Sequence, residues 1–483
     1  MEHKRWYVTQ RVLLGLMLAA FLLLCGVALA LGARQDGEHR LAFWLALAAL
    51  VPACLLLPVV SGWITRLGTR KGLLLLAGVC FIVKLLWVLA VQVPPSGDYA
   101  VFWDYAGSLS DRTVIFGGRY LALFPHIYGY AQFLSLFVSI FGRHVLVALV
   151  LNVLLSVAAG CLLHQICLGW LGHRAAVSAF LLWIACPSQT IYNSFVLSEP
   201  LYTTLMLGFL LLVTRLEGRG AGWKRPAPVG VAAGAVGGVL LRLIQGTRPI
   251  AAIWIVALAL WLVCIRPWQG GRAAIQLWGC FVGVLVVVYL LSGGMWNRLV
   301  AWRIGEEPSS TPGYSVLVGF NQASNGCWNQ DDSALLFQYS GEPGVSAQWV
   351  QEQMMDRAVE RITSGEIQFP HLFKEKLRVF LGGDDSCVSY ASPPLRHVQL
   401  FCRLCNTFYY LLLLLAMAGA VRLWRRDSRS PCTMAAMYVL GLTLAQMLVE
   451  VAGRYHYSIL PFLILLALSA RFPPPGKIVK SES

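Results

Sequence analysis

Apolar runs long enough to cross a bilayer recur along almost the whole chain, and they constrain its fold more than any other feature. A membrane-spanning helix needs about 20 apolar residues, because the hydrocarbon core is about 30 Å thick. Of the 483 residues, 58% are hydrophobic and only 13% are charged. We therefore predict an all-α polytopic membrane protein with about twelve transmembrane helices of roughly 15–25 residues. The expected spans are 12–31, 41–60, 72–93, 145–168, 175–191, 200–213, 229–245, 250–265, 273–291, 400–421, 434–449 and 457–470.

The net charge of +15 is carried largely by short loops between the apolar runs. This distribution is typical of membrane topology and argues against nucleic-acid binding. The positive-inside rule places the N-terminus and the basic loop 61–71 in the cytoplasm, and the segment after residue 93 outside. The apolar run 121–141 then decides the remaining topology. A crossing would put the basic loops 215–226 and 422–431 outside, so we expect this run, which is interrupted by proline and glycine, to lie along the membrane.

The segment 296–399 is far more polar than its surroundings and holds twelve of the 23 acidic residues. It is too polar to span and too long for a simple connection, so we expect a small extracytoplasmic α or α+β domain. Within it, Ser346–Ser364 is predicted to be a helix with Ser346 as N-cap and Gly365 as its stop. The expected division is a transmembrane hairpin with a basic cytoplasmic loop (1–71), a transmembrane core (72–295) with an acidic external loop (94–143), the extracytoplasmic domain (296–399), C-terminal transmembrane helices (400–472) and a cytoplasmic tail (473–483).

The loop 94–143 places acidic, aromatic and basic residues directly after an apolar span. Its characteristic residues are Asp98, Tyr99, Phe102, Ala106, Gly118-Arg119-Tyr120, Pro125 and Gly142. This order resembles the first external loop of the GT-C glycosyltransferases that use polyprenyl-phosphate sugars. That family includes the dolichyl-phosphate-mannose protein mannosyltransferases and the bacterial aminoarabinose transferases. The resemblance implies interfacial helices in this loop, an acid just after a span as catalytic base, which is Asp98 here, and inversion at the sugar. The Asp-Glu pair familiar in that loop is Asp98-Tyr99 in this chain.

Other candidate residues lie at the predicted outer ends of spans. Arg454 and Arg248 are expected to bind the donor phosphate, because arginine offers a permanently charged, bidentate partner. Tyr455 and His456 flank Arg454 and are included with it. The alternative for this group is interfacial anchoring with a snorkelling arginine. For Asp98, the alternative is a helix N-cap.

A further group of residues is expected to line the cavity or contact the acceptor. Its members are Asp104, Arg119, Tyr120, Glu199, Glu450, Trp328 and Asp331. The alternative for Glu199 is a capping role at the start of its span. Trp328 could stack on a sugar or be buried in a turn-rich loop. No metal-ligand set is found, and no cofactor is required, although a divalent cation is not excluded. Cys327 and Cys387 are the two external thiols and are candidates for a disulfide.

The predicted function is transfer of a sugar from a polyprenyl-phosphate donor to a hydroxyl on a glycan, lipid or protein, at the outer face of the plasma membrane. No nucleotide-binding fingerprint is found, which fits a lipid-linked donor. Two alternatives stay open. A polymerase or ligase of lipid-linked glycans would share the donor, whereas a transporter or flippase would favour ionisable groups near the bilayer centre and two similar halves.

Overall fold

The computed structural model describes residues 2–111, 115, 118–219, 224–266, 271–392 and 394–472, so the predicted tail 473–483 lies outside the described residues. Over these ranges the regular structure is helical, which confirms the predicted all-α class. The N-terminal half contains α1 (Glu2–Arg34), α2 (Gly37–Thr65), α3 (Thr69–Ala90), α4 (Asp98–Ser110), α5 (Arg119–Leu123), α6 (Pro125–Phe141), α7 (Val145–Trp170), α8 (His173–Ala185), α9 (Pro187–Tyr192), α10 (Glu199–Arg219) and α11 (Pro226–Thr247). The C-terminal half contains α12 (Ala251–Leu260) with a π-helical turn (Trp261–Ile265), α13 (Gly271–Ile304), α14 (Gly313–Gly319), α15 (Gln330–Ser340), α16 (Ala347–Thr363), α17 (Phe369–Leu381), α18 (Ser386–Ala391), α19 (Val398–Arg425), a 3-10 turn (Pro431–Thr433), α20 (Met434–Leu448), a 3-10 helix η4 (Gly453–Ile459) and α21 (Leu460–Ser469).

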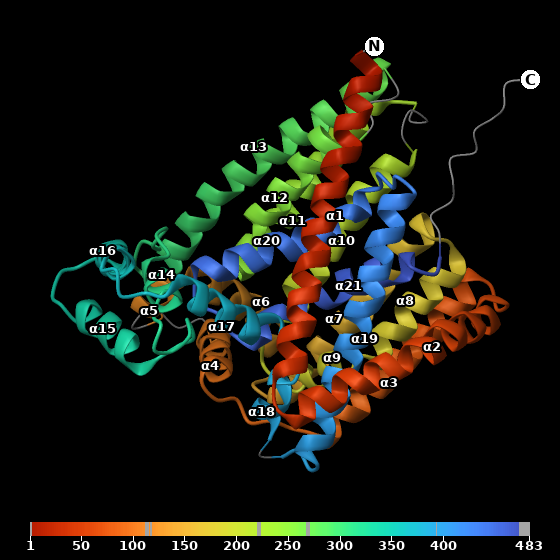
Figure 1. The fold of residues 1–483 in the computed structure, drawn as a ribbon. Helices are drawn as coiled ribbons and strands as arrows, with labels where there is room; N and C mark the ends of the chain where they lie inside the picture. The colour runs from red at the N-terminus through yellow and green to blue at the C-terminus, as the bar shows by residue number, and fades with distance from the viewer. Residues whose placement is uncertain are drawn as a thin grey trace, which may run out of the picture.

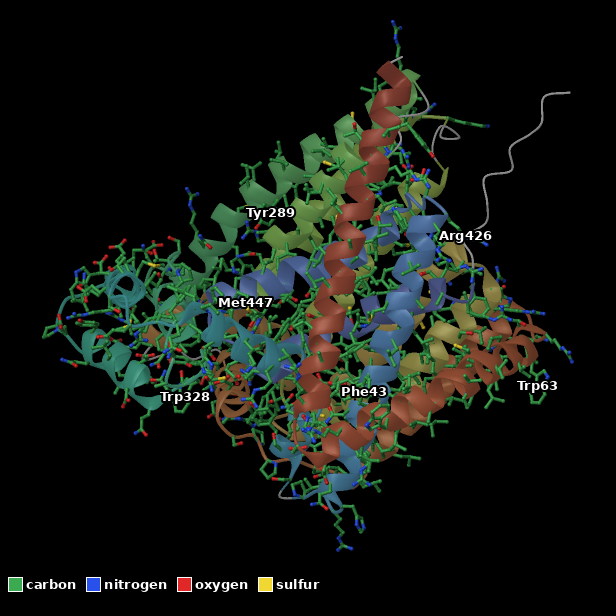
Figure 2. All side chains as sticks on the ribbon, in the orientation of Figure 1. Phe43, Trp63, Tyr289, Trp328, Arg426 and Met447 are labelled. Atoms are coloured by element: carbon green, nitrogen blue, oxygen red, sulfur yellow. The ribbon has the colours of Figure 1, made fainter. Side chains whose placement is uncertain are left out.

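The helices form a bundle (Figure 1), and the side chains at its two ends differ in chemistry. At the end that we call the basic end, Arg422 Nη1 donates to the carbonyl of Ala470 at 2.5 Å, and Arg429 Nη1 donates to Gln10 Oε1 at 2.7 Å. The other end, which we call the domain end, carries α4 to α6 and α14 to α16. Figure 2 shows many oxygen-tipped side chains gathered around α15 and α16, whereas Arg426 lies at the opposite end of the bundle.

Nine helices in the described ranges are long and apolar enough to cross a membrane. The three other predicted spans correspond to shorter helices: α8 has 13 residues, α12 with its π-helical turn covers Ala251–Ile265, and α21 has 10 residues. The predicted span 175–191 is interrupted because Pro187 starts a separate short helix after Cys186. α21 is almost completely buried inside the bundle. A helix in this position contacts other helices along its length, so it does not need the length of a lipid-facing span.

The packing of α3 against α7 settles how the segment between them runs. Val88, near the end of α3, packs on Leu149 and Val153, near the start of α7. The segment 91–144 therefore leaves the bundle and returns to it at the same end. α6 does not cross the bundle, as the sequence predicted from its interruptions and from the positive-inside rule.

α11 packs closely against α13 through glycines spaced one turn apart. Gly230, Gly234 and Gly238 face the backbone of α13, where a Cβ on each would overlap the carbonyls of Leu277, Phe281 and Leu285 in turn. Small residues at this spacing let two helix backbones approach closely. α13 has 34 residues, so at 1.5 Å per residue it is about 51 Å long and extends well beyond its predicted end at residue 291.

In the segment 296–399, the predicted helix at Ser346 is confirmed. Ser346 accepts a hydrogen bond from Trp349 N at 3.1 Å, Val350, Met354 and Ala358 are fully buried, and Gly365 has φ +78°. The first half, α14 to α16, projects from the end of α13 (Figure 1). From α17 onward the segment enters the bundle, where α17 packs against α1 and α20, and α18 against α9 and α19. The independence of 296–399 as a domain stays a prediction.

Candidate active site

Four segments that are far apart in the chain bring charged side chains together at the domain end. Asp98 is the first residue of α4, Glu199 is the first residue of α10, and Arg248 follows α11. The fourth segment is η4, with Arg454 and Tyr455. An Nη2 atom of Arg454 pairs with Oδ2 of Asp98, and the Nε atom lies 4.0 Å from Glu199 Oε1. The sequence predicted these residues at span ends on one side of the membrane, and the structure brings them into one cluster.

Local geometry explains the position of Asp98. Gly97, with φ +52°, turns the chain after Pro94 and Pro95, and α4 then begins. A carboxylate at the first position of a helix is stabilised by the helix dipole. A buried face of α4 anchors the helix by packing on α6. The ring centres of Phe102 and Tyr130 lie 5.1 Å apart at this contact. Asp98 itself is half exposed, so it can be reached from outside the protein.

Arg454 is held between aromatic rings as well as between carboxylates. Its guanidinium carbon lies 5.5 Å from the ring centre of Tyr99 and 5.4 Å from that of Tyr455. The side chain is only 12% exposed. A guanidinium that contacts aromatic faces keeps its N–H groups in its own plane for oxygen acceptors. The guanidinium carbon of Arg248 lies 4.0 Å from the ring centre of Tyr455, so Tyr455 contacts both arginines.

The loop that carries Glu450 is fixed by the segment 313–326 and by α17. Glu450 N donates to Ser315 O at 2.7 Å, and Lys376 Nζ donates to the carbonyls of Met447 and Val449 at 3.0 and 2.7 Å. The Glu450 carboxylate accepts a hydrogen bond from Tyr455 Oη at 3.3 Å. Burial raises the pKa of Glu450. Burial lowers the pKa of Lys376 to about 8.

His456 does not join this cluster, although it follows Tyr455 directly. It is fully buried, with Nδ1 donating to Phe380 O at 2.8 Å and Nε2 2.6 Å from Asp384 Oδ1. Burial alone would lower the pKa of His456, but the Asp384 carboxylate outweighs it, so the pKa is raised. Ser188 also donates to Asp384, at 2.5 Å. Since both ring nitrogens are engaged, we leave His456 out of the proposed phosphate site.

The remaining predicted residues lie around the cluster or away from it. Tyr120 is close to the cluster: burial raises its pKa, and the Asp98 carboxylate raises it further. Asp104 pairs with Arg143 at 2.9 Å on the exposed side of α4.

The others lie on the segment 296–399 or contact it. Arg119 binds Glu306 at 3.0 Å and so holds α5 to the segment after α13. Trp328 is 60% exposed and does not have the buried position that was one alternative, and Asp331 is exposed too. Figure 2 shows Trp328 on the surface of this segment.

Neither of the two features left open as cofactor or cross-link sites gains support. Among the described residues no three His, Cys, Asp or Glu side chains gather as metal ligands. Cys327 and Cys387 are both free thiols, and Cys387 is fully buried.

Sequence reasoning missed two contributors to the site, Tyr99 and Lys376, and the buried acid Asp384, which holds His456 in the interior. Tyr99 was noted only for its place in the loop, Lys376 was not singled out, and Asp384 was one acid among many in a polar segment. The available signal for Asp384 was its place in Gly382-Gly383-Asp384-Asp385, a tight break between two helices.

Comparison with known proteins gave one structural likeness. No protein-family model matches the chain, and no curated protein matches it. Among solved structures, the chain is similar to the crystal structure of ArnT from Cupriavidus metallidurans bound to undecaprenyl phosphate, with 14% sequence identity and a TM-score of 0.39 over 81% of this chain and 78% of that chain.

Proposed function

We propose that the protein is a membrane glycosyltransferase that moves a sugar from a polyprenyl-phosphate donor to a hydroxyl acceptor. The observation that carries the proposal is the cluster itself, at the end of an apolar bundle. The accessible carboxylate of Asp98 pairs with Arg454, and a second arginine, Arg248, lies over the ring of the neighbouring Tyr455. A donor of this class has a lipid chain for the bilayer and a phosphate for the arginines. Its sugar is already activated, because the phosphate is a good leaving group.

The residues divide the reaction between them. Asp98 accepts the proton of the acceptor hydroxyl, whose oxygen attacks the anomeric carbon. The bond between that carbon and the phosphate oxygen breaks, and the polyprenyl phosphate leaves with the electron pair. Arg454 and Arg248 stabilise the charge that develops on the phosphate. The buried carboxylate of Glu199 attracts the guanidinium of Arg454 and helps to keep it in place.

Because Asp98 and Arg454 form an ion pair, binding of the donor phosphate to Arg454 would also change the surroundings of Asp98. In the structure, Arg454 neutralises the carboxylate that we assign as base. A donor phosphate competes for the same guanidinium, and it thereby releases Asp98 toward the acceptor. In this proposal, binding of the donor prepares the base.

We place the site on the extracytoplasmic face of the cytoplasmic membrane. Support comes from the basic loops, which gather at the end of the bundle opposite to Asp98 and which the positive-inside rule assigns to the cytoplasm. A single cysteine introduced at Asp104 should react with an impermeant maleimide added outside intact cells, and one at Arg225 should not. The reverse pattern would invert the orientation.

The central experiment compares Asp98→Asn with Asp104→Asn. Both acids lie on α4, and both changes remove one charge with almost no change in volume. We expect Asp98→Asn to lower transfer from labelled polyprenyl-phosphate sugars by about 10²–10⁴-fold in reconstituted membranes, as for removal of a general base. Asp104→Asn should stay within a few-fold of wild type, because its ion pair is exposed. Equal activities for both variants would exclude Asp98 as the base.

The same preparation distinguishes the alternatives. A polymerase or ligase would use the same donor but require a glycan acceptor, so a panel of glycan, lipid and protein acceptors separates it from other transferases. A transporter would move labelled donor across the membrane without cleaving it. The intramembrane cation Lys84 is the feature that would suit a transporter. It hydrogen-bonds the neutral side chains of Gln189 and Thr190, which is also the arrangement of a satisfied structural group.

A further inference from the structure

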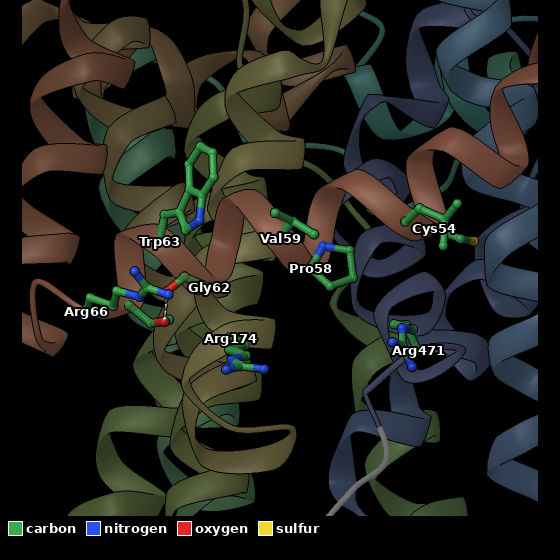
Figure 3. A pocket seen from close by; sticks show the side chains of 10 residues that line it. Cys54, Pro58, Val59, Gly62, Trp63, Arg66, Arg174 and Arg471 are labelled. Atoms are coloured by element: carbon green, nitrogen blue, oxygen red, sulfur yellow. Dashed lines mark hydrogen bonds between the residues drawn. The ribbon is translucent and has the colours of Figure 1, made fainter.

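A second concave site lies at the basic end of the bundle, away from the proposed active site. A cavity of about 620 Å³ opens between the end of α2, the start of α8 and the second residue after α21 (Figure 3). Three arginines line it: Arg66, Arg174 and Arg471. They come from three separate parts of the chain, so the fold gathers them and a single basic loop does not explain them.

The arginines line the cavity, and no acidic side chain in the described ranges pairs with them. None of the salt bridges formed among the described residues includes Arg66, Arg174 or Arg471. Arg174 lies against α2 at Gly62, where a Cβ would come within 4.0 Å of its Nε atom. A Cβ at this distance would make an ordinary van der Waals contact, and the further atoms of a larger side chain such as leucine would occupy space beside the guanidinium. Figure 3 shows α2 crossing above Arg174 and Arg471.

The opposite wall of the cavity is apolar. Leu55, Val59 and Trp63 of α2 contribute to the lining, and they are 65%, 50% and 64% exposed. This wall continues into the lipid-facing surface of α2, most of whose apolar side chains are exposed. Tryptophan favours the boundary between hydrocarbon and headgroups. The cavity thus combines a cationic floor with a wall suited to an acyl chain.

The cavity is separate from the cluster around Asp98. Arg66 is the residue after α2, and α3 starts three residues later; Asp98 follows the far end of α3. A helix of 22 residues is about 33 Å long, so the two sites lie near opposite faces of the bilayer.

We propose that this cavity binds the headgroup phosphate of an anionic phospholipid, with one acyl chain lying along α2. Basic pockets between transmembrane helices at the cytoplasmic surface recognise anionic headgroups in this way. The apolar wall favours a lipid over a free anion, which gains nothing from it. The bound lipid fills the space between α2 and α8 and fastens the otherwise lipid-exposed α2 to the bundle. This proposal is independent of the transfer reaction, and its test needs no sugar donor.

The test measures lipid binding to the purified full-length protein. Delipidated protein in neutral detergent is titrated with phosphatidylglycerol, phosphatidylcholine or sodium phosphate, and bound lipid is counted by native mass spectrometry while thermal unfolding is followed in parallel. We expect phosphatidylglycerol to bind at one saturable site and to raise the unfolding midpoint, and the other two ligands to do neither. The variant Arg66→Gln/Arg174→Gln/Arg471→Gln should bind phosphatidylglycerol at least roughly tenfold more weakly.

A matched control loses three positive charges at the same end of the bundle but outside the cavity, as Arg70→Gln/Lys71→Gln/Arg225→Gln. It should bind like wild type. Gly62→Leu provides a second approach that keeps every charge and narrows the cavity beside Arg174, and it should weaken binding as well.

Three outcomes would overturn the proposal. Equal loss of binding in the cavity variant and the control would show non-specific attraction to charge. Saturation by sodium phosphate alone would make the cavity a site for free anions. If Gly62→Leu and the triple cavity variant each bound phosphatidylglycerol as tightly as wild type, the lipid site would lie elsewhere. If the triple variant does not fold, Gly62→Leu and Arg174→Gln still decide the question.

Discussion

Replacing Arg454 with lysine isolates the geometry of the proposed phosphate site from its charge. Lysine keeps the positive charge but carries its three N–H groups on one tetrahedral nitrogen. It therefore cannot present spread, coplanar donors to Asp98 and Glu199 while its charged group lies flat between the rings of Tyr99 and Tyr455. Because Arg454 is only 12% exposed, water does not replace the lost contact easily. The change therefore tests whether the guanidinium binds a ligand or merely anchors the loop.

The expected magnitude follows from the contacts. A hydrogen bond to a charged group contributes about 1.5–3 kcal/mol. Loss of one such bond to the donor phosphate in the transition state would lower kcat/KM roughly 10- to 150-fold, at about 1.4 kcal/mol per factor of ten. Arg143→Lys is the matched control. Arg143 also pairs with a carboxylate of α4, that of Asp104, but its side chain is 49% exposed. An exposed pair contributes at most about 1 kcal/mol, so this variant should change kcat/KM by less than about fivefold.

The assay measures initial rates of sugar transfer in nanodiscs over a range of donor concentrations, together with equilibrium binding of unglycosylated polyprenyl phosphate. Arg454→Lys should weaken polyprenyl-phosphate binding and leave acceptor affinity unchanged. An anchoring arginine would tolerate lysine, because both side chains snorkel. Wild-type donor affinity in Arg454→Lys would therefore refute the reasoning and remove Arg454 from the phosphate site.

Three further predictions concern stability. Asp384→Ala leaves His456 buried without its partner and should lower the free energy of unfolding by about 3–5 kcal/mol, as for other broken buried pairs; a loss below about 1 kcal/mol in denaturant unfolding would show that the pair is not needed. Asp332→Ala should destabilise the α14–α16 region by a similar amount, about 3 kcal/mol, since Arg361 loses a carboxylate 2.7 Å away that is only 3% exposed; unchanged hydrogen exchange in α16 would contradict this. Burial lowers the pKa of Lys376 from 10.5 to about 8, so between about pH 8 and 10.5 the unfolded chain binds more protons than the native protein, and the contribution of Lys376 to stability rises with pH. Relative to Lys376→Met, the free energy of unfolding of wild type should increase as the pH rises through this window. A difference in free energy between the two proteins that does not change with pH would contradict the lowered pKa of Lys376.

Local signals explain why some features were predictable from the sequence. The α16 helix followed from a serine cap, a four-residue apolar repeat and a terminal glycine, all within twenty residues. Asp98 and Arg454 are 356 positions apart, yet both were assigned to one site, because hydropathy and positive loops determine on which side each span ends. Membrane topology thus restricts the end of the bundle at which distant residues lie.

The same signals say little about the direction of a side chain. Arg454 and His456 occupy one 3-10 helix, in which successive residues point about 120° apart. One reaches the cluster, and the other enters the protein interior to meet Asp384. The burial of Asp384 depends on a polar segment that enters the bundle from α17 onward, whereas the composition of that segment predicted an extracytoplasmic domain. The predicted span 175–191 was likewise too long, because hydropathy did not reveal that α8 ends at Ala185 and that Pro187 starts a separate short helix.

The glycine contacts between α11 and α13 fix the position of one helix along the other. Because Gly230, Gly234 and Gly238 each receive one carbonyl of α13, the two helices fit only in this register or in one shifted by four residues, about 6 Å along the axis. That register sets how far the last turns of α13 reach beyond the bundle, and hence the height at which Glu306 meets Arg119. A bulky residue at Gly234, deep in the bundle, would displace the whole outer segment relative to Asp98. Three glycines, through the absence of a Cβ, thus set the distance between the segment expected to contact the acceptor and the proposed base.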